Sequence, residues 1–187
     1  KEIKNKLGLW PLTGQIVAIC LLNPDTDKGK VFFQSQDVKI KPTIENNIQY
    51  EPSSEKELIE KFWQEIKNYQ QFITFNGRGF DCPYIMLRSA ILRIKPTINL
   101  MPNRYDARSH IDLLDQLTFY GAFRKFSLDF YCRSFGLKNT KTEGMSGEKV
   151  EEFFKQKKFM EIARYCADDV KATAELFLLW EKYINYA

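Results

Sequence analysis

The order of short apolar runs and amphipathic segments along this chain is the feature that most restricts its fold. Four runs of strand length are predicted: Gln15–Asn23, Lys30–Gln34, Phe72–Phe75 and His110–Leu114. Helices are predicted over Glu55–Tyr69, from Pro83 to about Arg93, from Ser127 to near Gly136, and once or twice within Glu148–Tyr186. Strands that alternate with helices in this way indicate a layered α/β domain.

Three local signals sharpen this prediction. Ser54 followed by Glu57 has the spacing of a capping box, so a helix is expected to begin just after Ser54. Pro83 suits the first residue of a helix, because the backbone N–H that it lacks would have no partner there. The turn formers of residues 24–29 predict a hairpin between the first two strands. Ser35–Pro52 is interpreted as a polar linker.

The composition excludes several classes of protein. Of the 187 residues 44% are hydrophobic, which is enough to form the core of one domain. A single domain over residues 1–187 is therefore expected. The longest apolar stretch is Ile16–Leu22, whereas a membrane span needs roughly 20 apolar residues, so no membrane partner is expected. The formal charge of +4 permits a polyanionic partner without requiring one. The four cysteines form no CxxC pair and are expected to be reduced, which indicates a cytoplasmic protein: Cys20, Cys82, Cys132 and Cys166.

A carboxylate lies where a predicted strand gives way to a predicted helix. The glycines of Asn76–Pro83 permit a sharp turn, and Asp81 is expected just outside the first helical turn. Ligands of open α/β sheets gather at such carboxyl ends of strands. The free amides of the helix start would keep the pKa of Asp81 low, which suits a metal ligand. The alternative is that Asp81 only caps the helix, with Phe80 packed beneath it.

A second carboxylate lies in the predicted C-terminal helix. Tyr165 and Asp169 are four residues apart and share one face. Asp169 borders the apolar stripe, so partial burial is expected, and the carboxylate then requires a cation, a hydrogen-bond donor or a raised pKa. The alternative for this pair is a hydrogen bond within the helix or to a neighbour. Asp168 follows Arg164 by four residues, which suits an exposed ion pair.

Taken together, these segments resemble the 3′-5′ exonucleases of ribonuclease H-like fold. Phe72–Ile85 resembles their second motif, and Tyr165 with Asp169 resembles the tyrosine form of their third motif. His110–Asp115 is similar to the corresponding segment of predicted exonucleases related to the proofreading domain of family B polymerases. The resemblance spans roughly Trp10–Trp180 and implies a mixed sheet flanked by helices.

The first motif of that family, an Asp and a Glu two residues apart on a strand, has no counterpart before Gln15. Lys1–Lys4 holds a single Glu among lysines, and Asp25 and Asp27 are turn residues. From the resemblance we expect the first strand and two metal ligands upstream of Lys1. A protein that truly began at Lys1 would expose two unpaired strand edges in the middle of its sheet, and we expect it to be poorly soluble or to fill that position with another chain.

The resemblance also implies a reaction. It is hydrolysis of the terminal phosphodiester bond at the 3′ end of a single-stranded nucleic acid, DNA rather than RNA, with two Mg²⁺ or Mn²⁺ ions. Asp81 and Asp169 are the implied metal ligands. Tyr165 is expected to orient the attacking water, because a tyrosine with a pKa near 10 is a poor general base. Asn76 is expected to hydrogen-bond a sugar or phosphate, and Phe80 to pack under the terminal nucleotide.

Other roles are expected for the neighbouring polar residues. Arg78 is either a substrate contact or a solvated loop charge, and His110, the only histidine, is expected to be structural. Asp112 and Asp115 are not assigned to the site. For Asp112 the alternative is that its side chain faces the cleft that holds the site. The implied biological role is DNA repair or proofreading. The alternative is a catalytically inactive nucleic-acid-binding or protein-interaction module on the same fold, which the missing acidic pair would favour if the protein truly began at Lys1.

Overall fold

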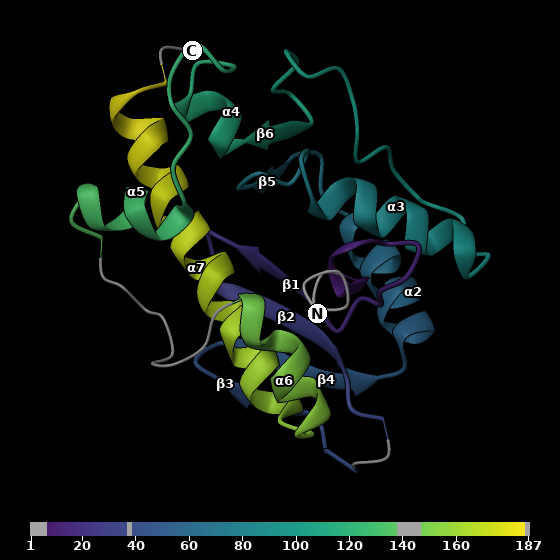
Figure 1. Ribbon diagram of the computed structural model, residues 1–187. Coiled ribbons are helices and arrows are strands. Elements are labelled where there is room, and N and C mark those ends of the chain that lie inside the picture. The colour runs from purple at the N-terminus through teal and green to yellow at the C-terminus, as the bar shows by residue number, and fades with distance from the viewer. Residues whose placement is uncertain (1–6, 37–38, 138–146, 186–187) are drawn as a thin grey trace.

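The strands of this protein form two sheets (Figure 1). The structure is a computed structural model that describes residues 7–36, 39–137 and 147–185, so Lys1–Lys4 lies outside the described residues. A four-stranded sheet has the order β1-β2-β4-β3, with β1 Ala18–Asn23, β2 Lys28–Gln34, β3 Thr43–Glu45 and β4 Ile48–Ser53. A second sheet pairs β5 (Phe72–Thr74) with β6 (His110–Asp112) in parallel.

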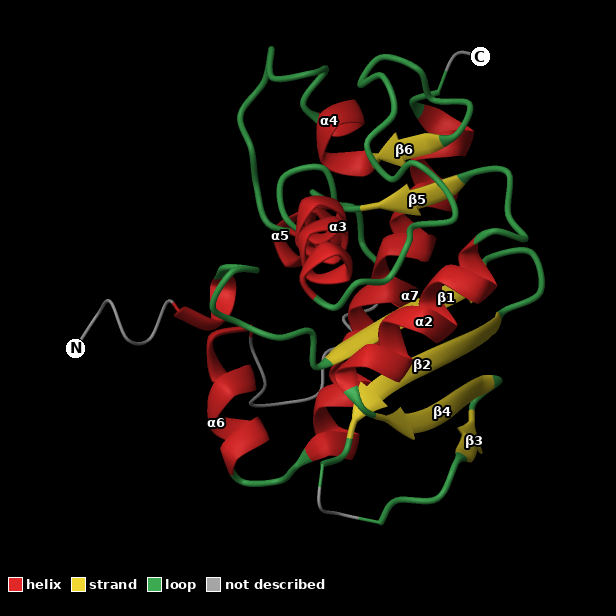
Figure 2. Cartoon of the chain, turned by 90° about the vertical axis from the view of Figure 1, so that its right-hand side faces the viewer, coloured by secondary structure: helices red, strands yellow, loops and turns green. Residues whose placement is uncertain are grey.

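The two sheets follow one another through the molecule without a shared ladder. In Figure 2 the strands succeed one another from top to bottom as β6, β5, β1, β2, β4 and β3. β1 pairs only with β2, and β5 only with β6, among the residues that the structure describes. β1 and β5 are therefore both edge strands within the described part of the chain.

Helices cover the sheets on both faces. Two short 3₁₀ turns, Leu7–Leu9 and Gly147–Lys149, accompany the helices α2 (Glu55–Ile66), α3 (Asp81–Ile91), α4 (Leu113–Leu117), α5 (Leu128–Ser134), α6 (Val150–Lys155) and α7 (Phe159–Tyr183). The long helix α7 contacts β1, β2 and β5, so it bridges the two sheets, while α2 contacts β1, β2 and β4 (Figure 1). None of the described helices is long and apolar enough to cross a membrane.

Alternation along β2 explains why both of its faces are covered. Phe32 packs in a core cluster with α2 and α3, whereas Val31 and Phe33 pack in a cluster with α7. Successive strand side chains point to opposite faces, so one apolar run supplies two layers of core. The predicted hairpin of β1 and β2 is confirmed by their antiparallel ladder.

The predicted capping box at the start of α2 is also confirmed. The backbone N–H of Ser54 donates to Glu57 Oε2 (2.8 Å), and the N–H of Glu57 donates to Ser54 Oγ (3.4 Å). Glu55, the first residue of α2, also accepts two hydrogen bonds from Arg88 of α3 and one from the backbone N–H of Ile16. This buried ion pair ties the segment before β1 to both helices.

Sequence predictions about three elements are wrong. The predicted strand His110–Leu114 ends at Asp112, because Leu113 begins the helix α4. Ser35–Pro52 is not a linker, because it contains β3 and most of β4, joined by Asn46 and Asn47 with φ of 47° and 64°. Asparagine tolerates such positive φ and forms tight hairpin turns, which is a signal that the linker interpretation overlooked. Helix α3 begins at Asp81 and not at Pro83, so Asp81 lies inside the helix.

Candidate active site

Asp112, at the carboxyl end of β6, holds the loop that follows β5. Its buried carboxylate accepts hydrogen bonds from the backbone N–H groups of Asn76 (2.8 Å), Arg78 (2.9 Å) and Leu114 (3.0 Å). Because β5 and β6 are parallel neighbours, their carboxyl ends meet at one edge, where this loop leads into α3. Asp112 thus fixes the start of the helix that carries Asp81. Sequence reasoning left Asp112 outside the site, although its position at the end of a strand was the signal for this role.

The loop itself admits only glycine at one position. Gly77 is buried, and a Cβ placed on it would lie 2.5 Å from the Cβ and Oγ1 of Thr74. Contacts this short are not tolerated, so a side chain here would push the loop away from β5. The preceding residue, Asn76, has a φ of 60°, in the left-handed region that asparagine adopts more readily than most residues.

Asp81 is the first residue of α3 and is open to solvent. Surrounding protein raises the pKa of its carboxyl to about 6, with further contributions from the charges of Asp112 and Asp169. A group that is crowded by protein and still reached by solvent lies in a concave part of the surface. The expectation of a low pKa is wrong, because crowding and repulsion by like charges outweigh the helix start. Asp81 is not the N-cap residue, because Phe80 occupies that position without a side-chain cap hydrogen bond, and the carboxylate of Asp81 accepts from its own backbone N–H.

Asp169 lies on α7, between the part of the helix that contacts β1 and the part that packs against β6. Cys166 accepts a hydrogen bond from the backbone of Cys20 in β1, whereas Leu176 and Phe177 pack in the cluster that contains Ile111 of β6. Asp169 follows Cys166 by three residues, on nearly the same face, and is half-buried as expected. The charge of Asp169 acts on Asp81, and the charges of both raise the pKa of the Cys166 thiol, in addition to burial. The fold therefore brings these two remote carboxylates into one neighbourhood.

The hydroxyl of Tyr165 is hydrogen-bonded to Asp169. Burial, the charge of Asp169 and this hydrogen bond together hold the pKa of Tyr165 well above its usual range, while the backbone N–H of Gly147 donates to the same oxygen. The alternative of a hydrogen bond within the helix thus describes the resting geometry. With so high a pKa, Tyr165 is a hydrogen-bond donor at neutral pH and not a base.

The other candidate residues near the loop differ in how far their side chains are free to contact a substrate. Phe80 is 42% exposed, with its ring 5.6 Å from that of Tyr84, so it is not packed beneath the helix. Asn76 is exposed, and its Oδ1 lies over Gly79. Arg78 is not a solvated loop charge, because its guanidinium donates to the carbonyls of Pro102 (2.8 Å) and Asn103 (3.3 Å) and so holds a neighbouring loop. The alternative of a substrate contact stays a prediction.

His110 has the structural role that was expected. It is 1% exposed, its Nε2 lies 2.8 Å from Thr74 Oγ1, and its ring stacks on Phe72. Burial, with the charge of Arg78, lowers the pKa of His110 to about 4, so the ring is neutral at pH 7. Asp115 is equally structural, because Arg104 donates two hydrogen bonds to its carboxylate.

The ion pair predicted for Arg164 and Asp168 is wrong. Both the Nε and the Nη2 of Arg164 donate to the carboxylate of Glu45 on β3, at 2.9 and 2.8 Å. The planar guanidinium matches a carboxylate with two parallel bonds, which a helical neighbour four residues away cannot offer as readily.

The comparisons with known proteins agree with this geometry. The sequence model of a family described as a predicted 3′-5′ exonuclease related to the exonuclease domain of PolB matches residues 12–186. The chain belongs to this family. The resemblance inferred from the motifs is thereby confirmed, and the mixed sheet with helices on both faces is its ribonuclease H-like fold.

DNA polymerases of three organisms are similar to the chain in sequence. The chain is 29% identical over 184 residues to DNA polymerase 1 of Sulfurisphaera ohwakuensis, covering 92% of this chain and 21% of that protein. It is 26% identical over 175 residues to DNA polymerase 1 of Sulfolobus acidocaldarius, covering 86% and 19%. A DNA polymerase of Desulfurococcus sp. (strain Tok) is 30% identical over 141 residues, covering 66% of this chain and 18% of that protein. The chain thus spans about a fifth of the length of these relatives.

The acidic residues present suit part of a metal site for this exonuclease family. Carboxylate oxygens are the donors that Mg²⁺ prefers, and the repulsion that raises the pKa of Asp81 is of the kind that a cation would relieve. No group of three or more His, Cys, Asp and Glu side chains able to hold a metal occurs within residues 7–36, 39–137 and 147–185. Asp81 and Asp169 are two donors, fewer than a complete site needs.

Proposed function

We propose that residues 1–187 form a single exonuclease domain that hydrolyses the terminal phosphodiester bond at the 3′ end of single-stranded DNA in a metal-dependent reaction. The observation that carries this proposal is the placement of Asp81, Asp169 and Tyr165 in one neighbourhood, within a chain of an exonuclease family. The names of the similar DNA polymerases favour DNA over RNA, and repair or proofreading as the role. The free cysteines favour a reducing compartment such as the cytoplasm.

In this proposal Asp81 and Asp169 are the residues that hold metal, and two bound Mg²⁺ or Mn²⁺ ions supply a Lewis acid and a water of lowered pKa. Asp81 is solvent-accessible and presented by the loop that Asp112 fixes, so its carboxylate is oriented in advance. The hydroxyl of Tyr165, which donates a hydrogen bond to Asp169, orients the attacking water by accepting a hydrogen bond from it. Phe80 packs under the terminal nucleotide, and Asn76 hydrogen-bonds its sugar or phosphate.

The charges of Asp81 and Asp169 limit how strongly these two residues alone can bind metal. Two divalent ions bring four positive charges, of which Asp81 and Asp169 offset half. A site with only these carboxylates binds Mg²⁺ weakly, because Mg²⁺ dehydrates reluctantly. The lack of a third acidic ligand among the described residues therefore favours a second candidate, an inactive nucleic-acid-binding or protein-interaction module on the same fold.

Degradation of a single-stranded oligonucleotide, labelled at its 5′ end, tests the first candidate. With the full protein and Mg²⁺, Asp169→Ala and Asp81→Asn should each slow hydrolysis by at least about a hundredfold, since a catalytic metal contributes several kcal/mol. Tyr165→Phe should slow it by about tenfold or more, as expected for loss of a positioned hydrogen bond.

Asp168→Asn is the matched control, because it changes the carboxylate next to Asp169 on the same helix and should leave the rate unchanged. Mg²⁺-dependent degradation that persists unchanged in Asp169→Ala would remove that residue from the site. A wild-type protein that binds the oligonucleotide and never shortens it would instead establish the inactive module.

A further inference from the structure

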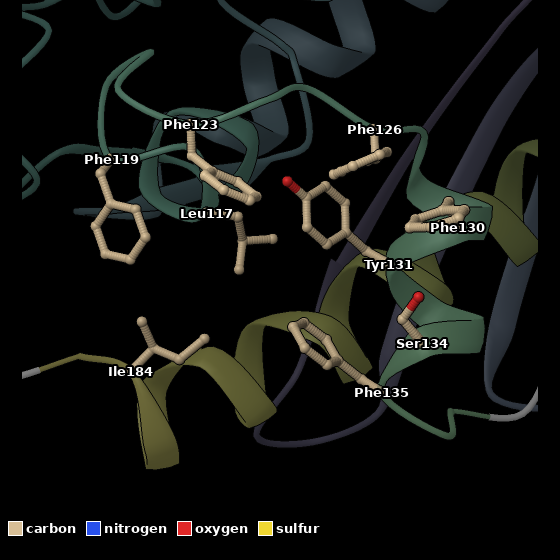
Figure 3. A pocket seen from close by; sticks show the side chains of 9 residues that line it. All are labelled: Leu117, Phe119, Phe123, Phe126, Phe130, Tyr131, Ser134, Phe135 and Ile184. Atoms are coloured by element: carbon tan, nitrogen blue, oxygen red, sulfur yellow. The ribbon is translucent and has the colours of Figure 1, made fainter.

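An apolar pocket lies beside α5 (Figure 3). Its volume is about 340 Å³, and five phenylalanines line it: Phe119, Phe123, Phe126, Phe130 and Phe135. They come from the connection between α4 and α5 and from α5 and its end, and Ile184 at the end of α7 closes one side. A pocket of this size accommodates a small flat molecule or a single ring system.

The phenylalanines of this pocket are unusually exposed. Phe119, Phe123 and Phe130 are 63%, 61% and 48% exposed. Single exposed apolar residues are common, but aromatic rings gathered around one hollow mark a binding surface. The rings are already ordered, since Phe126 stacks on Phe130 with centroids 4.6 Å apart and meets the edge of Tyr131.

The turn that carries Phe119 is held in an unfavourable conformation. Phe119 and Tyr120 have φ of 51° and 59°, a region that bulky residues rarely adopt. The fully buried Thr118 stabilises this turn through hydrogen bonds from its hydroxyl to the carbonyls of Leu114 and Asp115. Gln116 donates to the hydroxyl of Tyr120 as well. The exposed rings are therefore presented by a rigid support.

Positive charge lies beside the pocket. Arg124 and Lys125 are exposed between Phe123 and Phe126, and the Arg124 guanidinium lies 5.6 Å from the centre of the Phe126 ring. None of the side chains that line the pocket is acidic. Aromatic rings can stack on bases, and the neighbouring cations can pair with phosphates. The two features together are complementary to a single-stranded nucleic acid.

We propose that this pocket binds an unpaired base of a single-stranded nucleic acid, upstream of the nucleotide that is removed, with Arg124 and Lys125 contacting the adjacent phosphates. Every base has a face that stacks on phenylalanine, so this contact is independent of sequence. The inference rests on the proposed function, because it adds a second contact along the same strand.

The position of the pocket supports contact with the same strand. Asp112 caps α4, and Leu117 at the other end of that helix lines the pocket. Five helical residues span only about 7 Å. Tyr131, which also lines the pocket, packs against Phe75 just after β5, with ring centroids 6.0 Å apart. The pocket thus adjoins the segments that present Asp81.

Fluorescence anisotropy with a 5′-labelled oligothymidine tests the proposal with the full protein in EDTA, where binding is measured without hydrolysis. The double variant Phe119→Ala/Phe123→Ala removes two exposed rings and should raise the Kd at least about tenfold, as expected for lost stacking of one base. Trp10→Ala removes an aromatic residue of similar exposure (62%) elsewhere and should leave the Kd unchanged.

The charge and the base are tested separately. Arg124→Glu should weaken binding and reduce its dependence on salt, whereas Lys95→Glu, an exposed lysine beyond the far end of α3, should have a much smaller effect. An abasic strand of the same length should bind the wild type and the double variant equally, because it has no base to place in the pocket.

The outcomes separate this proposal from the proposed function. Unchanged oligothymidine affinity in the double variant, with hydrolysis still abolished by Asp169→Ala, overturns the pocket and keeps the nuclease. A wild-type protein that neither binds nor degrades the oligonucleotide overturns both. If the double variant converts a wild-type dimer into a monomer without changing the Kd, the pocket is an interface between two copies and the proposal is wrong.

Discussion

The four-stranded sheet and the β5–β6 sheet are built by different interactions. In the larger sheet, fully buried apolar side chains such as Val31 and Ile48 pack against helices. The smaller sheet pairs over three residues only, and the segments at its carboxyl edge are held by side chains that bond to backbone, above all Asp112. Apolar packing is tolerant of small shifts, whereas hydrogen bonds fix direction. Both sheets pack against α7, but only the smaller one holds the loop before Asp81 by hydrogen bonds to a buried carboxylate.

Ile48→Ala should have the largest effect on stability. Ile48 is 0% exposed on β4, so truncation leaves a cavity and should lower the free energy of unfolding by about 3 to 4 kcal/mol. Urea denaturation measures this change, and the folded variant should bind oligonucleotide with unchanged affinity. Ile44→Ala on β3, where the side chain is 75% exposed, is the control and should change stability by less than about 0.5 kcal/mol.

Asp112→Ala should lower the free energy of unfolding less than Ile48→Ala does, and it should weaken metal binding, which Ile48→Ala should leave unchanged. Three backbone N–H groups lose their acceptor, two of them in a loop that water reaches, so we expect a loss of about 3 kcal/mol. Calorimetric titration with Mn²⁺ should show weaker binding as well, because the loop before Asp81 is released. Asp25→Ala, an exposed turn residue, should change neither quantity. Wild-type Mn²⁺ affinity in Asp112→Ala would show that the smaller sheet does not depend on this carboxylate.

Asp81→Asn should have the smallest effect on stability, and a positive one. The pKa of Asp81 is raised in the folded protein from 3.8 to about 6, so between these values the folded state keeps a proton that the unfolded state has lost. Stability due to this group is therefore present below pH 4 and is lost as the pH rises through 6. Without divalent metal at pH 7, the variant should be more stable than wild type by about 1 kcal/mol, allowing for solvent screening.

Urea denaturation of both proteins across pH measures this difference, which should disappear below pH 4. His110 acts in the opposite direction, because its pKa is lowered to about 4 and its contribution is lost as the pH falls from 6.5. Since His110 is common to both proteins, it cancels. A wild type that is more stable than Asp81→Asn at pH 7 in the absence of metal would show that Asp81 has an unrecognised partner. Added Mg²⁺ should stabilise the wild type more than the variant.

Most elements of the fold were predictable because their signals are local. The capping box of α2, the apolar run of β1 and the Ser127 cap of α5 all depend on residues a few positions apart. β3 and β4 were missed because their evidence is a two-residue Asn46-Asn47 turn and a buried Ile48 and Tyr50 within a polar stretch. Parallel pairing of β4 with β2 gives those side chains a place in the core, and no local pattern reveals such pairing.

The candidate site divides in the same way. Residue type and spacing were sufficient to select Asp81, Tyr165 and Asp169 as candidates and to suggest the family. The pKa of Asp81 was beyond sequence reasoning, because it depends on like charges from two other elements. The hydrogen bonds of Arg78 and Arg164 were not predicted for a related reason, since their partners, Pro102, Asn103 and Glu45, are distant in the sequence.

The amino-acid sequence by itself determined most helices and strands, their order, and the acidic and tyrosine motifs of an exonuclease family, because side-chain periodicity, caps and motif spacing are properties of neighbouring residues. Only the tertiary structure decided that Asp112 supports the loop before Asp81, that Asp81 and Asp169 share one neighbourhood, and that five phenylalanines converge on one pocket. Those arrangements depend on distances between residues far apart along the chain, which packing sets and local chemistry does not.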